Sequence, residues 1–288
     1  MQQSITNIDD NAYEKYSVIK PPADYFGDNK RITRVVVDSR VRDTNLFLYP
    51  NEYDIPFEDD INDVVSAQLI YIDIPFSNYL INKYFNKFIV TLGAADFTVT
   101  LNESDYTDTQ LLTEIQDRLN DALGASVITA SHSDKTNKYT FTSSSEFTFK
   151  FTNQTNTLAM LLGFNRTKNY TSTWNGSAFV LTSEFKRNLN YNNYIIMDIE
   201  QFDILKSIDK NLNKSFAMIP RNYDTLNLGD SPQYVKYFSP PIPKLTKLRV
   251  RLYDRFGNPY DFQNQDHRFE IELTSFKQRR KYGNIFTQ

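Results

Sequence analysis

The sequence predicts a mainly β protein: an antiparallel, jelly-roll-like sandwich with a small inserted ββαβββα module. Three observations favour this fold class. Aromatic residues make up 15% of the 288 residues, with 19 Tyr and 22 Phe, and aromatic and β-branched residues favour strands. Glycine is scarce, at 8 residues, so Asn and Asp are expected to carry many of the turns. Several segments alternate between apolar and polar residues, which is the pattern of a strand.

The pattern divides the chain into four zones. We expect an extended N-terminal arm over residues 1–30, which are polar and contain Pro21-Pro22. Residues 31–87 and 166–276 are expected to form the core domain, a sandwich of about eight strands. Residues 88–165 form the inserted α+β module, and residues 277–288 form a basic tail without any acidic residue.

Two patterns define the strands of the core domain. The segment from Ser66 to Ile74 alternates but is largely apolar on both sides, which is typical of a strand covered on two faces. The segment from Lys247 to Tyr253 alternates between apolar and basic residues, which indicates a strand with one wet face. Between Asn51 and Asp63 lie six carboxylates and no Lys or Arg. We expect this stretch to be a solvated acidic loop or, alternatively, a surface that meets a basic patch on a partner.

The inserted module begins with a hairpin and contains one clear helix. The segments 88–92 and 97–101 are rich in β-branched and aromatic residues and lie around a hairpin-length turn. Thr107 and Gln110 fit a capping box, and leucine or isoleucine then recurs every four residues up to Gly124, which is placed to end the helix. Three further strands (126–132, 138–143 and 146–152) and a short helix (157–164) complete the order ββαβββα.

Composition excludes several classes of site. The chain has no cysteine and two histidines, which rules out disulfides, thiolate chemistry and a His-rich metal centre. The net charge is −3, so there is no overall basic field for nucleic acid. No run of about 18 apolar residues occurs, so no membrane span is expected. The N-terminus shows no secretory signal pattern.

We find no complete catalytic motif in the sequence. A Ser-His-Asp site could be assembled from distant residues, but His267 lies in an alternating segment and is interpreted as a strand or turn residue, and His132 as a solvated residue at a strand end. Glu58, Asp59, Asp60 and Asp63 lack the spacing of a cation-binding loop. The expectation is a protein that is not an enzyme and that binds no cofactor and no metal.

Candidate partner-binding residues lie in the arm, in one loop and in the tail. Aromatic residues of the arm could dock on a neighbouring chain, and an aromatic residue among Thr, Asn and Ser in the stretch 167–183 could bind a sugar or a protein. The basic residues of the tail could contact phosphates or anionic lipid heads. These candidates are Tyr13, Tyr16, Tyr25 and Phe26; Tyr170 and Trp174; and Lys277, Arg279, Arg280 and Lys281.

Three groups of residues resemble a known family. The first is Val35-Val36-Val37-Asp38-Ser39-Arg40-x-Arg42-Asp43-Thr44 with Tyr49-Pro50-Asn51-Glu52-Tyr53 and the strand from Ala67 to Pro75. The second is the module, from Phe97 to Leu112 and at Leu161-Leu162-Gly163-Phe164. The third is the closing hairpin from Leu248 to Leu273. Together they resemble minor capsid proteins of nucleocytoplasmic large DNA viruses, the group of giant icosahedral viruses that includes chlorella viruses.

The resemblance implies a structural role. It implies a minor capsid protein that cements capsomers of the major capsid protein, located in the capsid shell of the virion and made in the host cytoplasm. Its partners would be the major capsid protein and other minor capsid proteins, and the basic tail could contact the inner membrane surface. No specific nucleic acid and no small-molecule substrate is expected. The alternative is a fibre-like receptor- or glycan-binding virion module, and a weaker one is a hydrolase that uses paired carboxylates.

Overall fold

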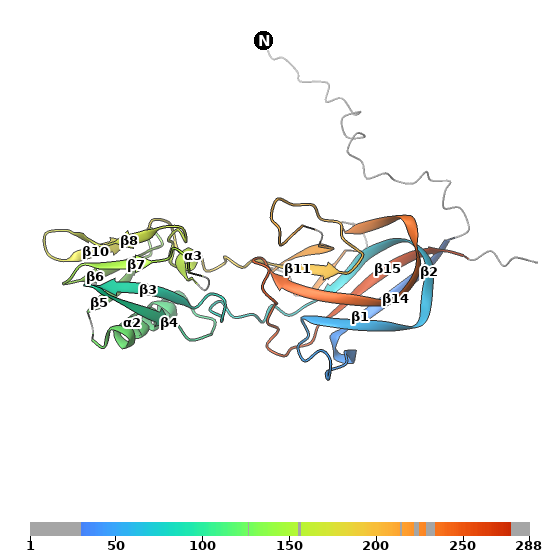
Figure 1. The fold of residues 1–288 in the computed structure, drawn as a ribbon, viewed down its shortest axis with the longest axis horizontal. Coiled ribbons are helices and arrows are strands. Elements are labelled where there is room, and N and C mark those ends of the chain that lie inside the picture. Colours follow the sequence, from blue (N-terminus) through green and yellow to red (C-terminus); the bar gives the residue numbers. More distant parts are fainter. Residues whose placement is uncertain are drawn as a thin grey trace, which may run out of the picture.

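A computed structural model describes residues 30–125, 127–154, 157–213, 215–221, 225–228 and 234–277. The predicted fold class is confirmed: the chain is mainly β, its sheets are antiparallel, and its architecture is consistent with a jelly-roll-like sandwich. Two lobes are visible in Figure 1, a larger lobe of long strands and a smaller lobe of short strands with helices. Each lobe has its own cluster of buried apolar residues.

The larger lobe is built from one seven-stranded sheet. The strands follow the order β1-β15-β2-β14-β11-β12, and β13 pairs with β2. Their bounds are β1 (Lys30–Asp38), β2 (Glu52–Asp73), β11 (Tyr194–Ile199), β12 (Ala217–Pro220), β13 (Thr225–Asn227), β14 (Val235–Asp254) and β15 (Arg268–Phe276).

This sheet curls because its longest strands bend. β2 has 22 residues, and Asp63 within it has a positive φ of 53°. The two ends of β2 come close together, since Asp73 pairs with Arg268 while the hydroxyl of Tyr53 lies 2.8 Å from the ring of His267. β14 changes register between Tyr237 and Ile242. Strands that bend in this way pass from one layer of a sandwich into the other, and Figure 1 shows the resulting curl.

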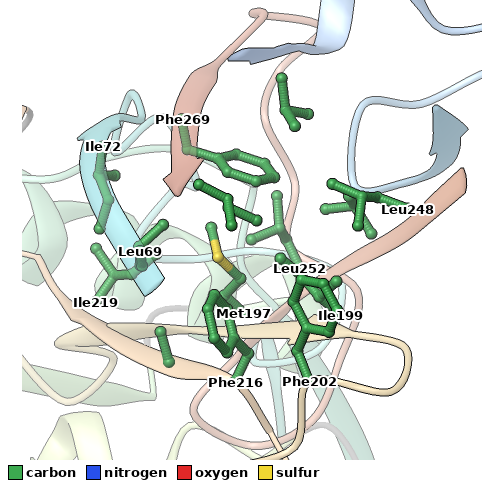
Figure 2. Packing of buried hydrophobic residues seen from close by; sticks show 14 of the residues in the cluster. Leu69, Ile72, Met197, Ile199, Phe202, Phe216, Ile219, Leu248, Leu252 and Phe269 are labelled. Carbon is green, nitrogen blue, oxygen red and sulfur yellow. The ribbon is translucent and has the colours of Figure 1, made fainter. Parts of the chain in front are cut away.

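The core of the larger lobe lies inside this curl. Side chains from β2, β11, β14 and β15 pack against one another there, as Figure 2 shows for Leu69, Met197, Leu252 and Phe269. The predicted inward residues of the strand near the C-terminus, Leu248, Val250 and Leu252, are buried as expected. Burial of this apolar surface is the main favourable contribution to the stability of the lobe.

The smaller lobe contains two four-stranded sheets, with the orders β5-β6-β10-β9 and β4-β3-β7-β8. Phenylalanine side chains fill the space between them, and adjacent rings such as Phe141 and Phe149 pack edge to face at 4.7 Å. The elements are β3 (Lys87–Leu92), β4 (Ala95–Thr100), α2 (Asp108–Leu123), β5 (Ile128–Ser133), β6 (Lys138–Ser143), β7 (Phe147–Lys150), α3 (Ala159–Leu162), β8 (Asn169–Thr171), β9 (Thr173–Trp174) and β10 (Phe179–Thr182).

Helix α2 begins and ends where the sequence predicts. The Thr107 side chain accepts a hydrogen bond from the backbone N–H of Gln110, and the Gln110 side chain accepts one from the Thr107 N–H, which completes the capping box. Gly124 has a φ of 69° and closes the helix in the left-handed conformation. The predicted apolar stripe is buried at Leu111, Ile115 and Leu119. Local sequence therefore determines this helix.

The smaller lobe is wider than the predicted 88–165 module. Residues 169–182 were expected to belong to the core sandwich, but β8 pairs with β7, and β10 pairs with β6. The buried cluster of the lobe also extends from Leu80 to Tyr191. The physical reason is that β6 and β7 each have a free edge whose backbone N–H and C=O groups are paired by a further strand, and the sequence pattern does not reveal which segment supplies that strand. That the module folds independently stays a prediction.

The acidic segment between Asn51 and Asp63 is a strand and not the expected loop. It forms the first half of β2 and pairs with the basic part of β14. Lys247 lies 2.6 Å from Asp54, and Lys244 lies 2.6 Å from Asp60. Glu52, Asp54 and Asp60 therefore meet basic residues of their own chain. Cross-strand pairs of opposite charge stabilise a sheet.

Candidate protein-interaction surface

The loop between β1 and β2, residues 39–51, starts with a capped turn. It opens as a short 3-10 helix, Ser39–Val41, and the Asp38 side chain accepts a hydrogen bond from the backbone N–H of Arg40. The Arg40 guanidinium also bonds this carboxylate and thereby holds the pKa of Asp38 below its usual range. A carboxylate at this position satisfies a backbone donor that the turn would otherwise leave free. The end of β1 thus has one defined geometry.

Arg42 anchors loop 39–51 to the rest of the lobe. Its side chain is only 7% exposed. The guanidinium donates to the carbonyl oxygen of Ser39 at 2.7 Å, to Asp266 Oδ1 at 2.6 Å and to the carbonyl oxygen of Phe47 at 3.3 Å. Ser39 Oγ donates to the same Asp266 oxygen at 2.8 Å. One buried cation therefore joins both sides of the loop to the residue that precedes His267 and β15.

The middle of the loop is also fixed by polar contacts. The carbonyl oxygen of Asp43 accepts hydrogen bonds from the N–H groups of Leu46 and Phe47 at 3.1 and 2.8 Å, and its carboxylate accepts one from the Asn45 N–H at 2.9 Å. Phe47 packs against the core cluster of the larger lobe. The loop is thus a folded element with an internal anchor.

Four apolar side chains point outward from this anchored loop. Val41 is 71% exposed, Leu46 75%, Leu48 64% and Tyr49 63%. Single exposed apolar residues are ordinary, but several on one short loop mark an interaction site. Because the loop is already ordered, a partner would not have to supply the free energy of ordering it. We refer to these four side chains as the apolar patch.

A buried histidine lies beneath the loop. The hydroxyl of Tyr53 lies 2.8 Å from Nε2 of His267, and the ring of Phe262 stacks on the imidazole at 4.6 Å. Burial lowers the pKa of His267 to about 3 and also raises the pKa of Tyr53. The imidazole is therefore neutral at physiological pH, and His267 is a buried residue next to β15, in line with its interpretation as a strand or turn residue.

Ser39, Asp266 and His267 lie together, but not in the order of a catalytic triad. Ser39 Oγ accepts a hydrogen bond from the backbone N–H of His267 at 2.9 Å and donates to Asp266. The imidazole faces Tyr53 instead of the serine. In a triad the histidine ring must reach the nucleophile hydroxyl. These three residues hold the loop in place.

Trp174 lies on a second fixed element, the hairpin of β9 and β10. Its side chain is 56% exposed, and its ring lies 5.2 Å from that of Phe179, its cross-strand partner. The Asn175 side chain accepts hydrogen bonds from the N–H groups of Ser177 and Ala178 at 3.0 and 2.9 Å. Gly176 has a φ of 102°, which glycine adopts without strain. The exposed indole is therefore held in a defined position.

Tyr170 has a different environment from Trp174. Its ring packs against Phe164 at 4.8 Å. Its hydroxyl donates to Glu184 and accepts a hydrogen bond from the Asn165 N–H at 3.0 Å. Within the residues that the structure describes, no ring contact joins Tyr170 to Trp174. The partner-binding role expected for Tyr170 stays a prediction, and Phe179 is the aromatic neighbour of Trp174.

The remaining candidates are in the terminal zones. Tyr13, Tyr16, Tyr25, Phe26, Arg279, Arg280 and Lys281 lie outside the described residues. Lys277 is the last described residue and is exposed at the end of β15, where it lines a groove between β1 and the acidic part of β2. His132, expected to be solvated, lies with Nε2 2.9 Å from Asp134 at the end of β5.

No group of three or more His, Asp or Glu side chains within the described ranges could hold a metal ion. None of the helices found there is both long and apolar enough to cross a membrane.

Sequence reasoning missed the apolar patch. The stretch from Asn45 to Phe57 alternates loosely and was interpreted as part of a β region, so Leu46 and Leu48 had no special meaning. The available signal was Asp43 followed two residues later by Asn45, because Asp and Asn favour turns. The apolar residues directly after them follow neither the period of a helix nor that of a strand. That the patch is exposed depends on Arg42 and Asp266, which are 224 residues apart in the sequence.

Comparison with known proteins identifies one family. Residues 28–186 match the model of a family of unknown function, DUF5901. This match covers more than half of the 288 residues, so the chain belongs to DUF5901. No curated protein matches the chain. Among solved structures, the chain is similar to the penton protein of mavirus, with 10% identity, a TM-score of 0.47, and coverage of 86% of this chain and 99% of that chain.

Proposed function

We propose that this member of DUF5901 is a structural protein of a virus capsid. In its specific form the proposal is a minor capsid protein that cements capsomers of the major capsid protein in the shell of a large icosahedral DNA virus. The chain would act through its surfaces and not as an enzyme. It would reside in the virion after synthesis in the host cytoplasm.

The observation that carries this proposal is the construction of loop 39–51. The stretch Asp38 to Asp43, which resembles the opening of virion proteins, contains the residues that anchor the loop: Asp38 caps the turn, Arg42 bonds Asp266, and Asp43 holds the following residues. The role of this motif is therefore to fix the loop that presents the apolar patch. A fixed, exposed patch suits a permanent protein–protein contact, in which a few apolar anchors supply most of the binding energy.

The partners we propose are the major capsid protein and other minor capsid proteins. Leu46 and Leu48 would enter apolar pockets on such a neighbour, and Tyr49 would add a rigid aromatic surface with a polar tip. The membrane contact expected for the basic tail stays a prediction.

The test is incorporation of variants into particles. In virus that carries Leu46→Asp together with Leu48→Asp, we expect the amount of this chain per coat polypeptide in purified particles to fall roughly tenfold or more. The reason is that two side chains that would be buried in the contact with the neighbour become charged. Quantitative mass spectrometry of the particles measures this ratio. Thermal unfolding of the purified variant should be unchanged, since both side chains are exposed.

Ile208→Asp is the matched control, because Ile208 is fully exposed on a different loop of the same lobe, between β11 and β12. It should be incorporated like the natural chain. Absence of the natural chain from particles would refute the capsid role. Unchanged incorporation of the Leu46→Asp, Leu48→Asp variant would show that the patch does not form the contact.

A second candidate function is a fibre-like receptor- or glycan-binding virion module. The exposed and fixed indole of Trp174 favours it, because a sugar ring can stack on an aromatic face. Titration of the purified chain with a glycan panel, followed by fluorescence of its single Trp, tests this alternative. Glycan binding by the natural chain that the Trp174→Ala variant has lost in a pull-down would favour this alternative over the capsid role.

A further inference from the structure

A cleft opens between the two lobes, beside the end of β14. It has a volume of about 950 Å³, which lies within the range of about 300–1,000 Å³ that is typical of binding sites. Arg166 and Lys186 line it from the smaller lobe, and Arg255 lines it from the larger one. The rings of Phe85 and Phe256, which also line the cleft, lie 4.6 Å apart. Aromatic surface and cations of both lobes therefore converge on one hollow.

One turn joins the two lobes at this cleft. The Asp254 carboxylate accepts hydrogen bonds from the N–H groups of Phe256 and Asn258 at 2.8 and 2.9 Å, which fixes the turn. The Arg255 guanidinium donates to the carbonyl oxygen of Tyr191 at 2.8 Å, and Tyr191 belongs to the buried cluster of the smaller lobe. Because these contacts join the walls, a partner would not have to supply the free energy of ordering them.

The cleft carries an excess of positive charge. The side chains of Arg166 and Lys186 are exposed, and within the described ranges they form no ion pair and no hydrogen bond. Arg255 bonds a carbonyl oxygen instead of a carboxylate, and Asp209 is the one acidic residue among the described residues that line the cleft. Three cations against one carboxylate give a positive surface, which attracts an acidic partner.

The chain exposes a complementary acidic segment in β2. Residues 57–60 have no paired residue on β14, because the ladder between the two strands shifts its register there. Extra residues of this kind leave the ladder and form a bulge, and we call residues 57–60 the acidic bulge. Asp60 pairs with Lys244 at 2.6 Å, whereas Glu58 and Asp59 are exposed and form no ion pair within the described part of the chain. Two carboxylates of the bulge are therefore available to cations of another molecule.

We propose that the inter-lobe cleft of one molecule binds the acidic bulge of a second copy of the chain. Glu58 and Asp59 would then lie beside Arg166 and Lys186, so that two unpaired carboxylates meet two unpaired cations. Figure 1 shows the bend of β2 at the end of the larger lobe that points away from the smaller lobe, so the bulge next to this bend does not face the cleft of its own molecule. The contact joins unlike surfaces and links molecules head to tail.

A second copy is the occupant that charge favours. Both surfaces occur on every copy, so each contact leaves one bulge and one cleft for the next molecules. An acidic segment of a different protein would fit the same cations, but the purified chain would then stay monomeric, so its oligomeric state distinguishes the two occupants. The inference does not depend on the proposed capsid role.

The test is charge reversal in the purified full-length chain, followed by sedimentation velocity over a range of concentrations. The natural chain should associate, and less so when the ionic strength rises from about 0.05 to about 0.5 M, because salt screens exposed charges. The cleft variant, Arg166→Glu with Lys186→Glu, and the bulge variant, Glu58→Lys with Asp59→Lys, should each lower the association constant roughly tenfold or more. An equimolar mixture of the two variants should recover association, because the reversed bulge of one meets the reversed cleft of the other.

Glu103→Lys with Glu146→Lys is the control, since it makes the same change of charge as the bulge variant at exposed positions of the smaller lobe and should associate like the natural chain. A natural chain that stays monomeric over the whole range of concentrations would overturn the proposal and favour an acidic segment of another protein. Association that either variant retains in full, or that the mixture does not recover, would show that the bulge does not bind the cleft. Incorporation into particles is measured separately, so failure of this contact and failure of the capsid role are distinguishable.

Discussion

Loop 39–51 and the hairpin of β9 and β10 both present exposed apolar side chains, but they are held in different ways. In the loop, a nearly buried Arg42 joins carbonyl oxygens and the carboxylate of Asp266. In the hairpin, the neutral side chain of Asn175 accepts hydrogen bonds from its own turn. The anchor of the loop is long-range and charged, whereas that of the hairpin is local and neutral.

The difference indicates how each surface responds to change. A buried charge that loses its partner costs several kcal/mol, whereas a lost hydrogen bond of a local turn costs about 1 kcal/mol. The loop should therefore be coupled to the stability of the whole larger lobe, and the hairpin should be able to loosen by itself. A surface coupled to the core suits a permanent contact, and a local hairpin suits an adaptable one.

Arg42→Ala should give the largest effect. It leaves Asp266 without its cation and three loop carbonyl oxygens, those of Ser39, Phe47 and Leu48, without their guanidinium donor. Because hydrogen bonds to a charged group are lost, we expect the free energy of unfolding to fall by about 2–3 kcal/mol. Equilibrium unfolding in urea measures this loss. Hydrogen exchange at Leu46 and Phe47 should accelerate in the same variant, because their donors lose the fixed turn.

Arg40→Ala is the matched control for this change. Arg40 also pairs with an aspartate, Asp38, but its side chain is 73% exposed, and exposed pairs contribute about 0–1 kcal/mol. If Arg42→Ala were no more destabilising than Arg40→Ala, the loop would not be anchored as described.

Mild acid should destabilise the base of the loop. Burial lowers the pKa of folded His267 to about 3, whereas an unfolded histidine has a pKa of about 6.5. Below pH 6.5 the unfolded state therefore binds a proton that the folded state does not bind. The free energy of unfolding then falls by about 1.4 kcal/mol per pH unit until the folded pKa is reached. Between pH 6.5 and 5 the expected loss is about 2 kcal/mol, measured by urea unfolding at each pH.

His267→Gln should remove most of this pH dependence while lowering stability at neutral pH, since Gln cannot stack on Phe262 in the same way. His132→Gln is the control and should keep it, because His132 lies in the other lobe near Asp134. A natural chain that is equally stable at pH 6.5 and 5 would contradict a buried neutral histidine.

Asn175→Ala should give the smallest effect. It removes an acceptor of local hydrogen bonds and should cost about 1 kcal/mol within the hairpin, with little change in global unfolding. Trp174 is the only Trp of the chain, so quenching of its fluorescence by acrylamide reports on the hairpin and should increase. Ser177→Ala removes one hydroxyl donor to Asn175 and should change quenching less. Equal quenching in the Asn175→Ala and natural proteins would mean that the turn does not hold the indole.

Local patterns predicted the parts of the fold that depend on neighbours in sequence. Thr107, Gln110 and Gly124 determine helix α2 through capping and the left-handed conformation, and these effects need no distant residue. The candidate site was predicted only in part. Trp174 was a candidate because a Trp stands out in a polar stretch; it is exposed, and its partner-binding role stays a prediction. The apolar patch was missed because its exposure depends on the ion pair of Arg42 with Asp266.

The sequence alone determined the mainly β class, helix α2 and its ends, and the basic character of residues 277–288. Tertiary structure decided that the acidic stretch is half of a bent strand, that residues 169–182 complete the smaller lobe, and that loop 39–51 faces outward. The physical reason is that alternation and capping are properties of residues close together in the sequence. Strand partners and buried ion pairs join residues far apart in the chain. Which strands pair depends on which apolar faces must be buried.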